Sequence, residues 1–370
     1  MPNKSDLKIR QAQSCLLGGA VGAALGAPVE LMSYEEILKT FGPQGISDYQ
    51  SFYRRPGAAT SGIQTMLFVA ESIIRSSLHG VRSDVFSLTN VIHNGLLRWL
   101  HSQGQAPHSD LDSDCLEINT TEGLLDNQRL WSFREPPQTC MKELAASTAY
   151  GQYALNNNNE SYPLLWAAPC AFSDSPFVAA SEAAKLTHGH PAVALSAGIL
   201  AEILSDLCLV ESPKKSDLVD ICRRVIIRHN DEKGFDTVSA IIEHTVRLSS
   251  EGVQPTPAVI DGLGDSASAE VVLASGLWFA FTADNFREGV LRAANHSGKS
   301  AQTAQIAGHV LGLTYGLDAL PSAWLIELEL REEIISLARD LVEVPLIQYD
   351  ERYRKLISVL EKYPGFNHSW

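Results

Sequence analysis

The stretch from Cys15 to Glu30 reads CLLGGAVGAALGAPVE and is unusually rich in small residues. A glycine inside a helix costs about 1 kcal/mol relative to alanine, so local stability does not explain this composition. It indicates instead that backbones pack closely at a buried centre. We therefore predict a small-residue helix, from about Gln11 to Leu25, at the middle of the fold. An active site near this helix is a second, weaker inference.

Outside this stretch, apolar residues recur at helical spacing through most of the chain. In the segment Val193–Leu209 they are Val193, Ala197, Leu200, Ala201, Leu204 and Leu207. The same spacing predicts helices over Leu67–Leu78, Asp217–Ile227, Thr237–Leu248, Ala269–Thr282, Phe286–Ala294 and Gln302–Leu313. Alternating β patterns of useful length are hard to find. The sequence therefore predicts an all-α protein of many medium helices.

Glycine and proline fall mostly between these segments, as loop signals do. The polar stretch from Asn156 to Ser161 is expected to be an exposed loop. There is no fixed-period repeat and no linker long enough to split the 370 residues. We predict one domain over residues 1–370 with a core from about 10 to 345, large enough to bury its apolar surface without disulfides or structural metals.

The net charge of −14 excludes some partners and leaves others open. Such a surface repels phosphate backbones and anionic lipid, so we expect no nucleic-acid and no membrane partner. It could attract a basic protein, although many cytosolic proteins are simply acidic.

The six cysteines have irregular spacing and no CxxC pair, so free thiols in a reducing compartment are expected. We find no signal-peptide core and expect no stretch long and apolar enough to span a bilayer. A cytoplasmic location follows by default.

Three familiar functional motifs are incomplete or absent in the sequence. The sequence Ser297-Gly298-Lys299-Ser300 resembles the end of a P-loop, but the glycine expected five positions before Gly298 is Ala293. Two histidines flank Gly189, in the order His188-Gly189-His190, without a Cys, Asp or Glu nearby to complete a zinc pattern, so packing or capping is the favoured role. No GxSxG nucleophile elbow is present.

Four stretches together resemble the ADP-ribosylglycohydrolase family and occur in its order. They are CLLGGAVGAALGAPVE (15–30), RPGAATSGIQTMLFVAES (55–72), LTHGHPAV (186–193) and NHSGKSAQTAQIAGHVLGLTYGLDALPSAW (295–324). The resemblance implies a compact orthogonal helical bundle that binds two Mg²⁺ ions and removes ADP-ribose from modified side chains. Two such hard cations want oxygen ligands, mostly carboxylates.

Most of the catalytic residues that the resemblance implies are absent. Glu30 matches the family glutamate and Thr60 matches the first member of its Thr-Asp-Asp triplet. The four positions where the family has metal-binding aspartates are Ser61, Gly62, Lys299 and Ala301, and the Thr/Ser position after them is Gln302. In the first motif Ala23 stands where an aspartate is usual. The family's Met-Arg ligand loop is replaced by residues 160–166, with Trp166 at the arginine position.

The resemblance also defines the ligand pocket that we expect. Its residues are Thr60, Ser61, Gly62, Trp166, His188, Ser297, Gly298, Lys299, Ala301 and Gln302, with Glu30 as the one remaining catalytic carboxylate. Ser61, Gly62, Lys299 and Ala301 are expected to lie close together. Without their carboxylates two divalent ions lose most of their stabilisation, and Lys299 adds repulsion. We therefore expect no metal cofactor, with Glu30 and Thr60 as vestigial ligands.

Three functional interpretations remain open. The first is a pseudoenzyme that acts by binding, for instance in immunity to or regulation of an ADP-ribosyltransferase. The second is an active hydrolase of ADP-ribosylated protein, cleaving an N-glycosidic bond with a compensated or metal-free site. The third is a protein that binds ADP-ribose without turnover. Lys299 is expected either to pair with Glu30, Thr60 or Gln302 or to extend to solvent, and the two alternatives are weighed evenly.

Overall fold

The computed structural model describes residues 4–79, 87–111, 123–346 and 359–363. Its α-helices are α1 (Lys4–Gly26), α2 (Tyr34–Phe41), α3 (Ser61–His79), α4 (Leu88–Ser102), α5 (Gln138–Ala146), α6 (Ala167–Cys170), α7 (Pro176–Lys185), α8 (Pro191–Cys208), α9 (Lys215–Arg228), α10 (Phe235–Ser250), α11 (Pro257–Asp261), α12 (Ala269–Thr282), α13 (Phe286–Ala294), α14 (Ser300–Tyr315), α15 (Ser322–Glu327) and α16 (Arg331–Glu343). Short 3-10 turns include η1 (Ala27–Val29) and η5 (Tyr162–Trp166). In these described ranges the β-structure amounts to two isolated bridges. The predicted all-α class is confirmed.

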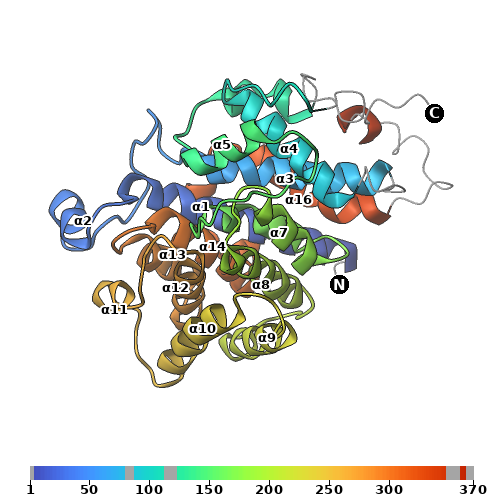
Figure 1. The fold of residues 1–370 in the computed structure, drawn as a ribbon. Helices are drawn as coiled ribbons and strands as arrows, with labels where there is room; N and C mark the ends of the chain where they lie inside the picture. Colours follow the sequence, from blue (N-terminus) through green and yellow to red (C-terminus); the bar gives the residue numbers. More distant parts are fainter. Residues whose placement is uncertain (1–3, 80–86, 112–122, 347–358, 364–370) are drawn as a thin grey trace.

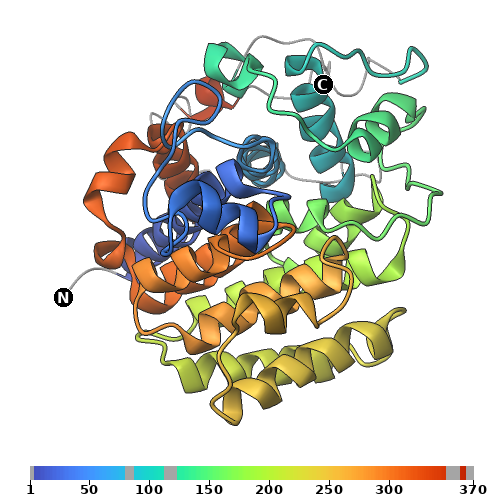
Figure 2. The same ribbon diagram turned by 90° about the vertical axis from the view of Figure 1, so that its left-hand side faces the viewer.

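Helices α1 and α14 form the middle of the molecule. Figure 1 shows α3, α4 and α16 on one side of this pair and α8, α12, α9 and α10 on the other. Seen from the perpendicular direction, the hairpin of α9 and α10 forms the outermost layer (Figure 2). The predicted helices correspond to observed ones, and those over 269–282 and 286–294 have the observed bounds.

The contact between α1 and α14 depends on glycine. A Cβ atom on Gly18 would lie 2.3 Å from the carbonyl oxygen of Gly308, and one on Gly22 would lie 1.9 Å from that of Ala304. One turn further, a Cβ on Gly26 would lie 2.5 Å from the Cα of Ala301. The prediction of a tightly packed small-residue helix is confirmed. The antiparallel pairing also brings the end of α1 to the beginning of α14.

Two expectations from the sequence need correction. The segments Ser5–Val29 and Pro191–Cys208 are long and apolar enough to cross a membrane by length and composition, although we expected no such stretch. The apolar windows are 89% and 72% buried inside the protein, so core packing accounts for their composition. The loop Asn156–Ser161 is not simply exposed, because Ser161 is buried.

The cysteines that fall in the described ranges, at 15, 140, 170, 208 and 222, are unpaired thiols. Cys115 lies outside the described residues. Burial raises the pKa of each of the five thiols.

Candidate functional site

Helices α3 and α14 begin at the same pocket, which has a volume of about 370 Å³. The chain that follows α1 lines one side of it, and the first residues of α3 and α14 line another. The remaining walls come from residues 52–53, from the 134–137 loop and from η5. The pocket is therefore built from segments that lie far apart in the sequence.

Seven of the residues selected from the sequence line this pocket. They are Glu30, Thr60, Ser61, Gly62, Lys299, Ala301 and Gln302. The four positions at which carboxylates are missing thus lie around one cavity, as expected.

The other four selected residues do not line the pocket. Trp166 is completely buried and packs edge-to-face against Tyr162, with ring centroids 5.4 Å apart. His188 is also fully buried, and its Nδ1 lies 2.8 Å from the Thr187 hydroxyl. Neither of these buried side chains lines the pocket.

Ser297 and Gly298 point away because the chain turns before Lys299. Gly298 has a φ of +88°, and its carbonyl accepts a hydrogen bond from the Leu31 N–H at 2.8 Å. The Ser297 hydroxyl donates to Asp261 and accepts from the Tyr34 N–H. Both residues hold the chain around the pocket together without reaching its interior.

Thr60 caps α3. Its hydroxyl accepts a hydrogen bond from the Ile63 N–H at 3.2 Å, which satisfies a helix donor that has no partner within the helix. Such a cap contributes about 1 kcal/mol. Thr60, which we expected to be a vestigial metal ligand, therefore has a structural role.

Glu30 caps α14 in the same way. Its Oε2 accepts from the Ala301 N–H at 2.6 Å, and its Oε1 accepts from the Gln302 side-chain amide at 3.2 Å. Burial raises the pKa of Glu30, whereas the Lys299 charge and the hydrogen bonds from Ala301 and Gln302 lower it, and burial prevails. Both carboxylate oxygens are thus already engaged.

Lys299 lies beside Glu30 without forming an ion pair with it. The ammonium group is near enough for its charge to lower the pKa of Glu30, but among the described residues it has no hydrogen-bond or ion-pair partner. The side chain is half-buried. The structure therefore falls between the two alternatives: the lysine faces the pocket but does not form the close buried pair.

Leu165 occupies the space in front of Gly62. A Cβ atom on Gly62 would lie 2.5 Å from Leu165 Cδ1 and 3.2 Å from Leu165 Cβ. Leu165 belongs to the segment 160–166, and the Ser161 hydroxyl in that segment donates to Gln302 Oε1 at 2.7 Å. The replaced loop thus fills the place where a larger side chain at position 62 would go.

A second wall was missed by the sequence reasoning. Arg134 lies 4.7 Å above the ring of Tyr53 and contacts both carboxylate oxygens of Glu329, at 3.2 and 3.0 Å. Glu329 also accepts from the Ala59 N–H at 2.8 Å and so fixes the chain just before α3. The Tyr53 hydroxyl donates to Glu135 at 3.3 Å, and burial and Glu135 raise the pKa of Tyr53 to about 12.

No sequence motif identifies this wall of the pocket. The backbone conformation of three lining residues marks it instead. Leu31, Tyr53 and Glu135 line the pocket and have positive φ values of 67°, 48° and 48°. Non-glycine residues seldom adopt this conformation, and such strain tends to cluster at functional sites. This conformation is visible only in the structure.

A pair of Mg²⁺ ions does not fit the side chains at this pocket. Mg²⁺ prefers an octahedron of oxygens supplied largely by carboxylates and water. Here the carboxylate of Glu30 already accepts two hydrogen bonds, and an ammonium stands beside it. Across the described residues, no three His, Cys, Asp or Glu side chains are grouped so that they could hold a metal.

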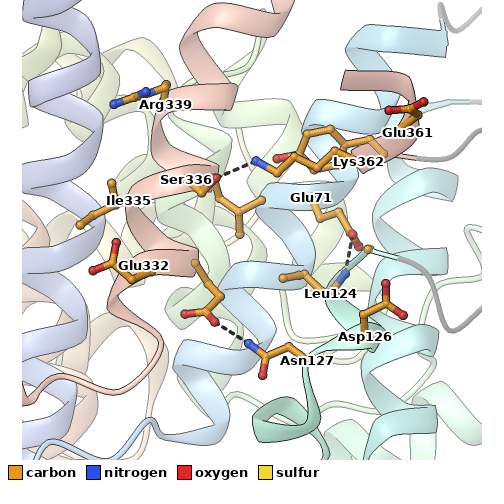
Figure 3. A pocket seen from close by; sticks show the side chains of 14 residues that line it. Glu71, Leu124, Asp126, Asn127, Glu332, Ile335, Ser336, Arg339, Glu361 and Lys362 are labelled. Carbon is orange, nitrogen blue, oxygen red and sulfur yellow. Dashed lines mark hydrogen bonds between the residues drawn. The ribbon is translucent and has the colours of Figure 1, made fainter. Parts of the chain in front are cut away.

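A larger cavity of about 780 Å³ lies elsewhere, between α3, α16 and residues 123–127 (Figure 3). None of the residues selected from the sequence lines it. Two of its carboxylates have structural partners, because Glu71 pairs with buried Arg98 and Glu333 accepts from the Asn127 amide. We therefore take the pocket at α3 and α14 as the candidate site.

Comparison with known proteins finds relatives of one family along nearly the whole chain. The family model for ADP-ribosylglycohydrolase matches residues 4–350. The chain is 23% identical over 340 residues to an ADP-ribosylarginine hydrolase of Serratia proteamaculans, covering 90% of this chain and 78% of that protein. It is 21% identical over 336 residues to an ADP-ribosyl-(dinitrogen reductase) glycohydrolase of Rhodospirillum rubrum, covering 87% and 92%. A solved ADP-ribosylglycohydrolase-related protein complex has the same fold, with a TM-score of 0.65 and 21% identity over 92% of this chain and 99% of that one.

Proposed function

The chain belongs to the ADP-ribosylglycohydrolase family, and from that premise we propose that it acts by binding, without two-metal hydrolysis. The observation that carries the proposal is the state of Glu30. Both of its oxygens accept hydrogen bonds from the first turn of α14, and Lys299 lies beside them. A carboxylate used as a helix cap, next to an ammonium, is a poor ligand for a divalent cation.

The packing at Gly62 supports the same proposal. Because Leu165 fills the adjacent space, an aspartate at position 62 would need the Leu165 side chain to move. A residue of the segment 160–166 thus occupies the space that an aspartate at position 62 would use. A single reversion would not rebuild a metal site.

The open pocket supports the proposal that the protein still binds a ligand. Strained residues at its rim and the buried Arg134–Glu329 pair hold an open cavity of about 370 Å³, within the size range of ligand pockets. We propose ADP-ribose or an ADP-ribosyltransferase as the class of partner. In this proposal the protein is cytoplasmic.

The alternative proposal is a metal-free hydrolase in which Glu30 transfers a proton. Its raised pKa favours this role, since a catalytic acid or base works best with a pKa near the operating pH. Against it stands the commitment of both carboxylate oxygens to α14. Acid–base catalysis by one group contributes about 10²–10⁴-fold, far less than a metal-assisted mechanism supplies.

The deciding experiment is hydrolysis of an ADP-ribosylated arginine substrate by the purified protein. We expect release of ADP-ribose no faster than in buffer, with Mg²⁺, with Mn²⁺ or with EDTA. Release well above buffer that Glu30→Gln abolishes would contradict the binding proposal. If that release persists in EDTA, the metal-free alternative is correct.

A further inference from the structure

The electrostatic character of the pocket points to a particular class of ligand. The first residues of α3 and α14, including Ser61, Gly62, Ala301 and Gln302, line it. The N-terminus of a helix carries the equivalent of about half a positive charge. Two such ends at one cavity favour negative charge, provided that donors remain to receive it.

Both carboxylates at the pocket accept hydrogen bonds from the protein. Glu30 accepts from the Ala301 N–H and from the Gln302 side chain, and Glu135 accepts from the Tyr53 hydroxyl. Arg134 donates from Nη2 to both oxygens of Glu329, and its buried Nε has no hydrogen-bond partner among the described residues. Glu30 thus accepts two hydrogen bonds beside an ammonium group, whereas Glu135 is exposed and accepts one, on a single oxygen.

The groups that remain available are donors. The Lys299 ammonium has three N–H donors and, among the described residues, no hydrogen-bond or ion-pair partner. The Tyr162 side chain is 3% exposed, and its hydroxyl forms no hydrogen bond of ordinary geometry within the described structure, although the Ser61 and Thr65 side chains lie near it. A buried hydroxyl that lacks a well-formed hydrogen bond is costly, and an acceptor in the pocket would give it one.

We propose that this pocket binds an oxyanion, with Lys299 as the charged anchor and the Ser61 and Tyr162 hydroxyls as further donors. The inference rests on the proposed binding function and names the chemistry of its ligand. A phosphate group and a carboxylate are both oxyanions, but the phosphate is tetrahedral and the carboxylate is planar. The protein's net charge of −14 opposes capture of any anion, so affinity must come from these local donors and should weaken with salt.

The test is calorimetric titration with inorganic phosphate and, separately, with acetate, both in EDTA and at constant ionic strength set with NaCl. We expect one saturable site for at least one of the two anions, and the stronger binder identifies the geometry. Lys299→Met should weaken binding at least tenfold and Lys299→Arg should largely retain it. Lys233→Met is the matched control, because Lys233 is an exposed lysine on the loop between α9 and α10.

Two results would overturn the inference: no saturable binding of either anion, or equal binding by wild type and Lys299→Met. Tyr162→Phe, which removes one buried hydroxyl, gives a second measurement if Lys299→Met does not fold, and it too should weaken binding. Because EDTA excludes metal-dependent turnover, the titration is independent of the hydrolysis assay. Failure of the proposed function and failure of anion binding therefore appear in different experiments.

Discussion

Replacing Gly62 by alanine tests whether the pocket wall has closed against a side chain at that position. Gly62 is the second residue of α3, where glycine has no conformational requirement. The added Cβ would lie 2.5 Å from Leu165 Cδ1 and 3.1 Å from Gln305 Oε1. Carbon atoms normally approach to about 3.5–4.0 Å, so the 4%-exposed Leu165 side chain would have to move.

The sign of the stability change distinguishes the two possibilities. In a helix with open space, glycine to alanine stabilises by about 1 kcal/mol. Forcing an extra carbon into a packed wall costs about 1–3 kcal/mol. We therefore expect Gly62→Ala to lower the free energy of unfolding by about 1 kcal/mol. At an unobstructed helix position the same substitution would raise it by a similar amount.

Urea denaturation is the assay, and Gly262→Ala is the matched control. Gly262 has a φ of −79° and its nearest contact would be the Val259 carbonyl oxygen at 3.3 Å, so we expect a change within about 0.5 kcal/mol. Leu165→Ala alone should cost about 2–5 kcal/mol. In the double variant the penalty of Gly62→Ala should disappear, a coupling of about 1–3 kcal/mol. If the Gly62→Ala variant is more stable than wild type, Leu165 does not obstruct a side chain at position 62.

Three further predictions follow from the same contacts. Glu30→Ala should lower the free energy of unfolding by about 1–2 kcal/mol, because α14 loses its cap, and thermal unfolding measures this. Lys299→Met should change it by less than about 1 kcal/mol, since no ion pair is broken; a loss of 3 kcal/mol would show a buried pair after all. Stability should fall as pH decreases from about 6.5 to about 4, because burial lowers the pKa of four histidines to about 4, and the unfolded chain therefore binds more protons. Each of these histidines contributes up to about 1.4 kcal/mol per pH unit in that window. A free energy of unfolding that stays constant from pH 7 to pH 4 would contradict this prediction. These histidines are His93, His188, His296 and His309.

The helices were predictable because their signals are local. The pattern over 286–294 gives the observed α13, and Asn285 at its start accepts from the Glu288 N–H, as a helix cap does. The central position of α1 was also predictable, because only small residues allow the observed approach to α14. Spacing and residue size are enough for such inferences.

The pocket was only partly predictable because its walls meet through tertiary contacts. Ser297 and Gly298 are neighbours of Lys299 in the sequence, yet a positive-φ glycine turns them away. Arg134 and Tyr53 line the pocket because buried Glu329, almost two hundred residues beyond Arg134, holds the arginine in place. No periodicity or motif connects these positions, so single-sequence reasoning could not assemble them.

The fold itself explains why losing carboxylates would reverse the charge preference of this site rather than neutralise it. Packing of α1 against α14 fixes one helix start at the pocket, and the Thr60 cap and the Glu329 contact to Ala59 fix the other. Both positive helix ends remain whichever side chains occupy the first turns. Carboxylates at those turns would outweigh the helix dipoles and attract cations. With Ser61, Gly62 and Ala301 in their place, and with Lys299 added, the dipoles and the ammonium dominate, so the same backbone favours an anion.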